Sequence, residues 1–264
     1  MESTARLRVV VLLILIVVAL VSSLGALLWG NQEWDGLALN LGSEMAGAVV
    51  TYALLELFIG RRERREAEGK ELAAKKADLI AQMGSQVQDV AIAAAEELQR
   101  HGWLTDGSLR GAILGGANLE GAILGGANLE GINLGRANLE GANLGGANLQ
   151  GAILILANLQ GANLSQANLQ GANLLAANLQ GAFLIWANLQ GANLLEANLQ
   201  GAFLVQANLE EANLLGAFLV RANLEGANLD ENTTLPDSTK WTPDTDMARF
   251  TNPDHPNFWQ PGAE

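Results

Sequence analysis

The chain has 264 residues, a net charge of −13 at pH 7 and no cysteine. The lack of cysteine excludes a disulfide framework, a thiolate metal site and a cysteine nucleophile. The acidic balance argues against nucleic-acid binding, which needs a basic surface to neutralise phosphates.

The first element is an apolar stretch at residues 7–29, in which Arg8 is the only charge. A transmembrane helix needs about 20 apolar residues, whereas the apolar core of a cleaved signal peptide has only about 7–15. A second apolar stretch follows at 37–59, after a short polar loop. We therefore predict a transmembrane hairpin at 1–60 that contacts the lipid bilayer through residues 7–59.

Positive charges flank this hairpin and are absent from its connecting loop. Arg6 and Arg8 precede the first span, and four arginines follow the second, at 61, 62, 64 and 65. Since Lys and Arg accumulate in cytoplasmic segments, we predict a multi-pass protein of the inner (cytoplasmic) membrane with both termini cytoplasmic. The four arginines can also contact anionic headgroups, at about 1 kcal/mol per charge.

The second span contains a carboxylate, Glu44, about two turns from its start. A carboxylate at mid-bilayer costs about 2.5–3.5 kcal/mol, so Glu44 is expected to face the partner helix, a neighbouring copy or the headgroups. A role in proton or solute transport is the alternative. Ser43, Gly47 and Thr51 form a seam of small residues that permits close helix contact.

Residues 61–102 are rich in helix-favouring residues and predict a cytoplasmic helical linker, broken at Gly84. Ser85 and Gln88 have the spacing of a capping box. An apolar stripe runs along the linker through Ile80, Met83, Val87, Val90, Ala94 and Leu98. We expect the stripe to cover the open end of the domain that follows; a coiled-coil contact between chains is the alternative.

Residues 103–230 follow a five-residue pattern. Leucine recurs at every fifth position from Leu109 to Leu229, and alanine stands two residues before each leucine from 112 to 227, except at Ile132. A period of five fits neither a helix nor a strand, but four units make a square coil. With leucine and alanine inside, about six coils rising roughly 4.8 Å each would bury one continuous column.

The unit Ala-Asn-Leu-X-X, as at 117–121, resembles the pentapeptide-repeat family over some two dozen consecutive units. The resemblance implies a β-solenoid, namely a right-handed quadrilateral β-helix. It also implies that a membrane anchor is compatible with the family. The quinolone-resistance members of the family resemble duplex DNA in size and charge and bind topoisomerase.

Every second unit is nearly constant, so constant units should form two opposite faces of the square. Glutamines twenty residues apart are expected to stack in two hydrogen-bonded ladders, one of Gln150, Gln170 and Gln190 and one of Gln160, Gln180 and Gln200.

The two variable faces hold the candidate interaction surface. One face has Ile155, Leu175, Leu195 and Leu215, and the opposite face has Phe183, Ile185, Trp186, Phe203 and Val205. Soluble monomers seldom expose large contiguous apolar patches, which favours contact with lipid, another copy or a protein partner. The alternative is that a wall held by its inner leucines tolerates apolar residues outside.

The tail at 231–264 contains all five prolines and four aromatic residues, Trp241, Phe250, Phe258 and Trp259. Prolines prevent a regular helix, and so many aromatic residues are unusual in a disordered segment. The tail is therefore expected to cap the last coil.

No pattern in the chain predicts a catalytic, metal or cofactor site, so we predict a protein that is not an enzyme. The leading hypothesis is a membrane-anchored scaffold that displays the rod at the cytoplasmic face. The alternative is a DNA mimic that binds topoisomerase, or, with less support, a small transport or channel component. Acidic residues are sparse along the rod, whereas a duplex carries one charge per about 1.7 Å.

Overall fold

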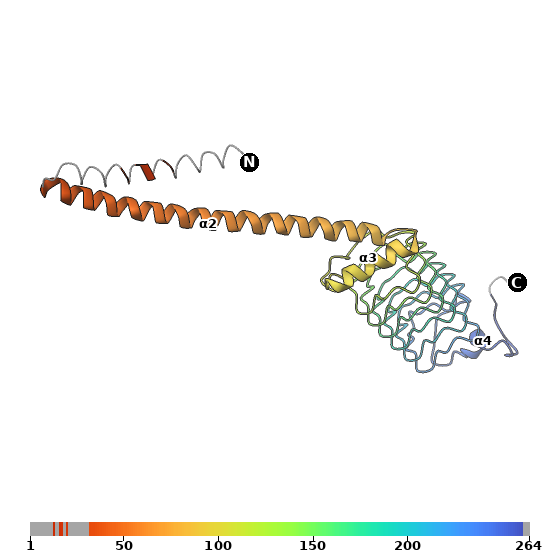
Figure 1. Ribbon diagram of the computed structural model, residues 1–264. Helices are drawn as coiled ribbons and strands as arrows, with labels where there is room; N and C mark the ends of the chain where they lie inside the picture. Colours follow the sequence, from red (N-terminus) through yellow and green to blue (C-terminus); the bar gives the residue numbers. More distant parts are fainter. Residues whose placement is uncertain (1–12, 14–15, 18–19, 21–31, 261–264) are drawn as a thin grey trace. The chain divides into compact units, whose positions relative to one another are not determined.

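The computed structural model describes residues 13, 16–17, 20 and 32–260. The chain divides into two compact units, Met1–Ala73 and Ala74–Glu264. The described residues form three helices and a coiled stack of short parallel bridges (Figure 1).

Helix α2 (Gln32–Met83) is one uninterrupted helix of 52 residues. It includes residues 32–36, predicted as a loop, and runs through the predicted boundary at 60. An isolated glycine such as Gly60 costs a helix about 1 kcal/mol without ending it, and no proline interrupts this segment. The helix ends where Gly84 follows, whose N–H donates to the carbonyl of Ala81 at 3.1 Å.

Within the part of the chain that the structure describes, no helix is both long and apolar enough to cross a membrane. The prediction of two transmembrane helices is therefore not supported there. The first predicted span, 7–29, lies largely outside the described residues, and the second, 37–59, is helical as part of α2.

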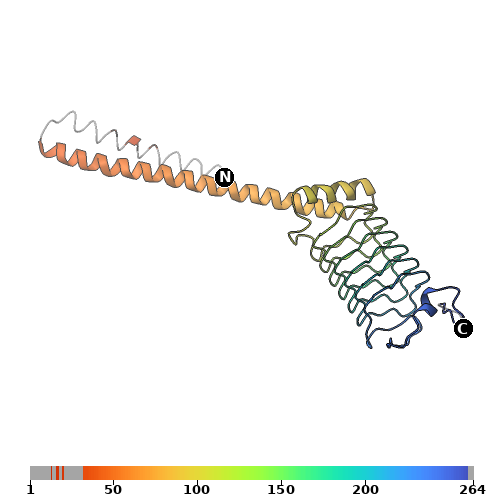
Figure 2. The same cartoon turned by 90° about the horizontal axis from the view of Figure 1, so that it is seen from below.

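The repeat region is a stack of four-sided coils, seen side-on in Figure 2. Parallel bridges join residues twenty apart from Ile113↔Asn133 to Asn208↔Asn228, which confirms the predicted twenty-residue coil. The last parallel bridge, Asn213↔Thr234, spans one residue more, so the coil after Leu229 contains an insertion.

Backbone hydrogen bonds hold neighbouring coils together at every side. The N–H of Leu139 donates to the carbonyl of Asn158 at 2.7 Å, and the N–H of Asn158 donates back to Ala137 at 2.9 Å. The repeat leucines are buried from Leu109 to Leu219. Leucine and alanine therefore point inward as predicted, and the core is one continuous column.

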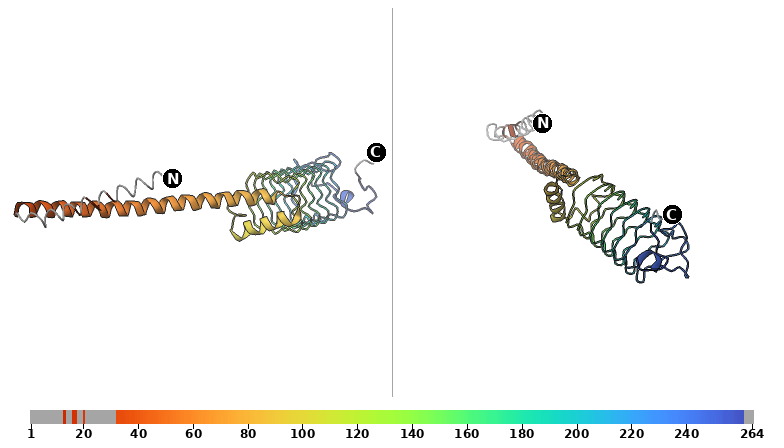
Figure 3. Two further views of the ribbon diagram at one scale, coloured as in Figure 1. Left: turned by 45° about the horizontal axis from the view of Figure 1, so that its top comes forward. Right: turned by 90° about the vertical axis from the view of Figure 1, so that its right-hand side faces the viewer.

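Helix α3 (Gln88–Arg100) lies at the first end of the stack (Figure 3). Its buried residues are Ala91, Ala94, Ala95 and Leu98. Backbone N–H groups of the first coil, which would otherwise be unpaired, donate to the preceding segment: Asn118 to Ser85 and Asn128 to Leu104, both at 2.8 Å. The first end is thus capped.

The expected stripe and capping box on this segment are partly wrong. Val87 and Val90 are exposed, because α3 starts at Gln88 and turns Ala91 and Ala95 inward instead. The Ser85 hydroxyl accepts the N–H of Val87 at 3.0 Å rather than capping the helix.

The tail packs at the other end of the stack, where α4 (Ala248–Thr251) lies (Figure 3). Phe250 is fully buried and meets Trp259 edge-on, with ring centroids 5.8 Å apart. The N–H of Arg221 donates to the carbonyl of Thr251 at 2.7 Å. The tail therefore satisfies backbone groups of the last coil.

Candidate interaction surface

The four residues Ile155, Leu175, Leu195 and Leu215, which we call the aliphatic column, stack as predicted. Backbone hydrogen bonds join successive members of the column. The N–H of Leu156, which follows Ile155, donates to the carbonyl of Leu175 at 3.0 Å, and the N–H of Glu196, which follows Leu195, donates to the carbonyl of Leu215 at 2.9 Å. Leu215 is exposed, and the other three are half-buried. The column is therefore a continuous but shallow apolar ridge.

The opposite face contains the aromatic patch, which we define as Phe183, Ile185, Trp186, Phe203 and Val205. Phe183 and Phe203 are bridge partners, and their rings stack with centroids 5.1 Å apart and planes within 4°. Trp186 is 58% exposed, and its ring N–H donates to the side chain of Gln206. The patch thus presents three aromatic rings to solvent.

Two bulky residues on these faces adopt a costly backbone conformation. The second residue after each repeat leucine from Leu109 to Leu224 has a positive φ, and on the constant faces it is usually glycine, as at Gly161 and Gly181. Leu156 and Trp186 adopt the same conformation, with φ of 58° and 57°. A left-handed conformation costs a residue other than glycine about 1–2 kcal/mol. Glycine would fit these two positions at a lower backbone energy, so the stability of the turn does not explain the presence of Leu156 and Trp186.

The sequence patterns did not single out Ile113 and Ile123, although they are 81% and 56% exposed. Both occupy the position before a repeat leucine, where asparagine is usual. Phe218 replaces asparagine in the same way and is also exposed. The replacement of asparagine by a large apolar residue is the signal that would have identified them.

The two constant faces are lined by asparagine ladders. On one face, each amide donates to the asparagine one coil before, at 3.0–3.2 Å, through Asn118, Asn138, Asn158, Asn178 and Asn198. A second ladder on the opposite face joins Asn128, Asn148, Asn168 and Asn188. These faces are polar and already bonded within the wall.

One of the two predicted glutamine ladders forms. Gln150 donates to Gln170 at 3.5 Å, and Gln170 donates to Gln190 at 3.2 Å. On the other face, Gln160 instead accepts the amide of Asn178 at 3.4 Å. The asparagine ladder there competes for the glutamine side chain.

Formal charges lie mostly on the constant faces. Arg110 pairs with Glu130 at 2.5 Å, and the backbone N–H of Glu211 holds the pKa of Asp230 at about 2. On the face of the aromatic patch, the units at 142–146, 162–166, 182–186 and 202–206 contain no charged residue. The first charge beyond the patch on this face is Glu225, one coil after Val205.

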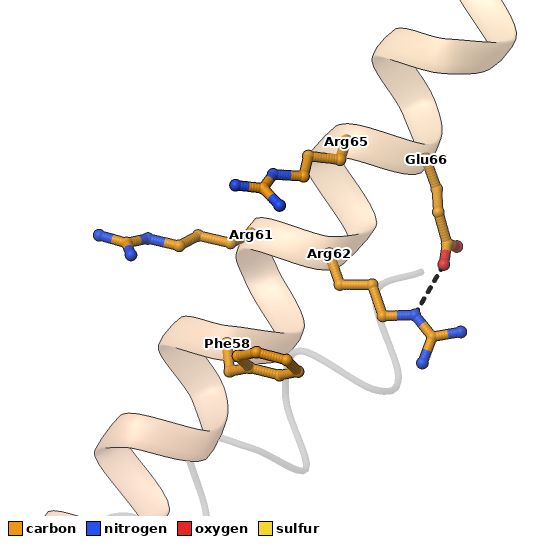
Figure 4. Close-up of a pocket in the computed structure, with 5 residues that line it drawn as sticks. All are labelled: Phe58, Arg61, Arg62, Arg65 and Glu66. Carbon is orange, nitrogen blue, oxygen red and sulfur yellow. Dashed lines mark hydrogen bonds and ion pairs between the residues drawn. The ribbon is translucent and has the colours of Figure 1, made fainter.

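A pocket of about 380 Å³ on α2 is a second candidate site. Among the described residues it is lined by Phe58, Arg61, Arg62, Arg65 and Glu66 (Figure 4). Arg62 is paired with Glu66 at 2.8 Å. The pocket is thus cationic and has one aromatic wall.

Across the described residues, no group of three or more His, Cys, Asp and Glu side chains is placed to hold a metal ion. The two histidines are engaged elsewhere. His101 stacks on Trp103 with centroids 4.3 Å apart, and His255 lies 2.9 Å from Asp246.

The family model for pentapeptide repeats matches residues 104–230, with 8 copies. The chain belongs to the pentapeptide-repeat family. As a pentapeptide-repeat protein it has a right-handed quadrilateral β-helix, whose twenty-residue coils are those described above. No curated protein sequence gives a significant match.

Several solved structures are similar to this pentapeptide-repeat protein. One from the cyanobacterium Cyanothece 51142 is 46% identical over 39% of this chain and 63% of its own, with a TM-score of 0.27. One from the Arabidopsis thaliana thylakoid lumen is 33% identical over 40% of this chain and 70% of its own, with a TM-score of 0.22. QnrB1, a plasmid-mediated fluoroquinolone resistance protein, is 22% identical over 47% of this chain and 65% of its own, with a TM-score of 0.31. The chain thus covers less than two thirds of the cyanobacterial protein and of QnrB1.

Proposed function

We propose that this protein is a non-enzymatic scaffold, anchored in the inner membrane by its N-terminal segment, whose repeat rod binds another protein at the cytoplasmic face. The aromatic patch is the observation that carries the proposal. Its three aromatic rings are exposed, and the units that carry them contain no charged residue.

The patch has the composition of an interface centre. Aromatic residues are enriched and charged residues depleted at the cores of protein interfaces. In a chain with a net charge of −13, a patch without charged residues is also where another acidic protein, including a second copy, meets little repulsion. The aliphatic column on the opposite face offers a shallower second contact.

The anchor proposal has two supports. The sequence has one charge in the apolar stretch 7–29. In α2, the large apolar residues Val50, Leu54, Leu55, Leu57 and Phe58 are 53–70% exposed, and four arginines follow them directly. Exposed apolar residues followed by basic residues are typical of a segment at a membrane boundary.

The test of the binding surface replaces four of the five patch residues by the residues that occupy the corresponding positions of the unit 162–166 on the same face. Phe183→Asn, Ile185→Ser, Trp186→Gln and Phe203→Asn reproduce the pattern of the unit 162–166. The variant should keep its melting temperature, because the substituted side chains face solvent. It should lose the protein that the original chain retains on affinity purification from detergent-solubilised membranes.

A matched control changes exposed glutamines on a constant face, Gln180→Ser and Gln200→Ser, and should retain the bound protein. Equal recovery from the patch variant, or a monomeric original chain with nothing bound, would contradict the proposed contact. Self-association is distinguished by purifying the tagged chain in the presence of an untagged copy.

The alternative, a duplex mimic that binds topoisomerase, has less support. Between Leu109 and Asp230 the chain has eight acidic and three basic residues, and a DNA duplex of the predicted rod length, about 29 Å at one charge per 1.7 Å, has roughly 17 charges. Inhibition of topoisomerase supercoiling by the soluble unit would support this alternative over the scaffold.

A further inference from the structure

One face of α2 changes from apolar to cationic along its length. Val50, Leu54, Leu57, Arg61 and Arg64 are spaced by four and three residues in turn, which places them on one side of a helix. Phe58 and Arg65 are also four residues from a member of this series and share its side. The change in character falls between Phe58 and Arg61.

The arginines around the pocket differ in what they contact. Arg62 is engaged by Glu66, whereas Arg61 and Arg65 have no ion-pair partner among the residues that the structure describes. Figure 4 shows the Arg61 and Arg65 side chains extending to the same side of the helix, away from the Arg62–Glu66 pair. Two guanidinium groups four residues apart are thus available together.

The segment 61–65 has four arginines and one glutamate in a chain of net charge −13. An anion is attracted here more than to the rest of the protein. Guanidinium groups bind phosphate oxygens through paired hydrogen bonds, which lysine cannot reproduce. The exposed apolar side chains one and two turns away would suit the hydrocarbon part of the same molecule.

We propose that Arg61 and Arg65 bind the phosphate of an anionic phospholipid headgroup, with Phe58, Leu57 and Leu54 along its acyl chain. The inference rests on the proposed membrane anchor and adds a ligand to it. The same two arginines could hold a soluble phosphate, and the experiment separates the two sources.

The test reconstitutes the full chain in phosphatidylcholine vesicles doped with spin-labelled phosphatidylglycerol or phosphatidylcholine. Electron paramagnetic resonance then measures the ratio of association of the two lipids with the protein. Each arginine near an anionic lipid raises the association constant for that lipid about fivefold. With one or both arginines in contact, the original chain should prefer phosphatidylglycerol by roughly five- to 25-fold. Arg61→Gln/Arg65→Gln should bring the ratio close to one.

The control is Lys70→Gln, which removes a positive charge from the same helix outside the pocket lining. Glutamine and arginine have similar helix propensities, so both variants should remain helical. The control should keep most of the lipid preference. An equal loss in both variants would mean that diffuse charge, not the Arg61–Arg65 pair, selects the lipid, and would overturn the proposal.

Two further outcomes separate the lipid site from the anchor. If both lipids associate equally with the original chain, the anchor stands and the headgroup site fails. If neither lipid associates, the anchor and the headgroup site both fail. Titration of the detergent-solubilised chain with inorganic phosphate then tests whether the pocket binds a soluble phosphate. Phosphate binding that Arg61→Gln/Arg65→Gln abolishes would assign the pocket to a soluble phosphate instead.

Discussion

At the residue scale, three positions of the five-residue unit have separate tasks. Leucine fills the column, and alanine leaves room for the neighbouring wall. Asparagine stabilises the turn that follows, since its side-chain oxygen accepts the N–H two residues on. The N–H of Gln160, for example, donates to the Asn158 oxygen at 3.3 Å. In the ladders the asparagine amide N–H also donates to the preceding coil. The two positions after leucine carry little of the fold, so function can vary there.

Substitution of a column leucine should disrupt the rod. Leu179→Asp places an unpaired carboxylate among apolar side chains and should lower the free energy of unfolding by several kcal/mol. Gln180→Asp, one residue along, is exposed and should change it by about 0.5 kcal/mol or less. Denaturant unfolding followed by circular dichroism measures both, and equal midpoints would contradict the inward assignment of leucine.

Substitution of a ladder asparagine isolates the contribution of the ladder. Asn168→Ala removes the ladder bonds to Asn148 and Asn188 as well as the turn bond from Gln170. Asn163→Ala removes a turn bond from Ser165 at 3.0 Å, with no ladder bond among the described residues. Since a net hydrogen bond contributes about 1 kcal/mol, Asn168→Ala should lower the free energy of unfolding by about 1–2 kcal/mol more than Asn163→Ala does. Equal unfolding free energies would show that the ladder adds nothing.

At the scale of elements, the first cap is held by ion pairs as well as by buried alanines. Lys75 of α2 pairs with Glu97 of α3 at 2.9 Å. Lys76 pairs with Asp106 at 2.8 Å and lies 4.9 Å from the centre of the Trp103 ring. The last turns of α2, α3 and the start of the repeats are therefore linked to one another.

This link should make stability depend on pH. The hydrogen bond from Lys76, followed by that from Ser108, lowers the pKa of Asp106 from 3.8 to about 2. Because the folded pKa is lower than the unfolded one, the contribution is complete above about pH 4 and is lost as the pH falls towards 2. Asp106→Asn should therefore melt below the original chain at pH 5, and the two melting temperatures should converge near pH 2.

The control for this experiment is Asp244→Asn, an exposed tail carboxylate without a hydrogen bond or ion pair in the described structure. It should follow the original chain at every pH. A difference between Asp106→Asn and the original chain that persists unchanged at pH 2 would rule out the proposed protonation of Asp106.

At the scale of the whole molecule, the rod and the N-terminal segment have different requirements. The repeat unit buries its own core, and residues of α3 and of the tail pack against that core within residues 74–264. The segment before it exposes large apolar side chains along α2, which an aqueous surface disfavours. The rod has its own buried core, whereas the N-terminal segment leaves apolar side chains exposed. This difference is consistent with the proposal that the rod is a displayed module and the N-terminal segment is its membrane anchor.

The proposed topology predicts where a reporter fused after Glu264 is active. β-Galactosidase, which requires the cytoplasm, should be active there, and alkaline phosphatase, which requires the periplasm, should not. The expectation rests on the arginines at 6, 8, 61, 62, 64 and 65 and on the positive-inside rule. The opposite pair of activities would reverse the topology, and loss of the chain from washed membranes would refute the anchor.

The sequence by itself determined the periodic part of this protein. Contacts in the rod join residues at one fixed separation. Counting in steps of five and twenty therefore places the repeat leucines from Leu109 to Leu219 inside, and the aromatic patch and the aliphatic column on opposite faces. It also identified one of the glutamine ladders.

Only the tertiary structure decided the aperiodic contacts. The inward face of α3, the Lys76–Asp106 pair and the burial of Phe250 join residues with no regular spacing, so no pattern in the chain predicts them. Two further features depended on alternatives of similar energy. Gln160 accepts a bond from Asn178 instead of joining a glutamine ladder, and α2 continues through residue 60 instead of ending there. Such choices are settled by the side chains that packing brings together, which the order of residues along the chain does not specify.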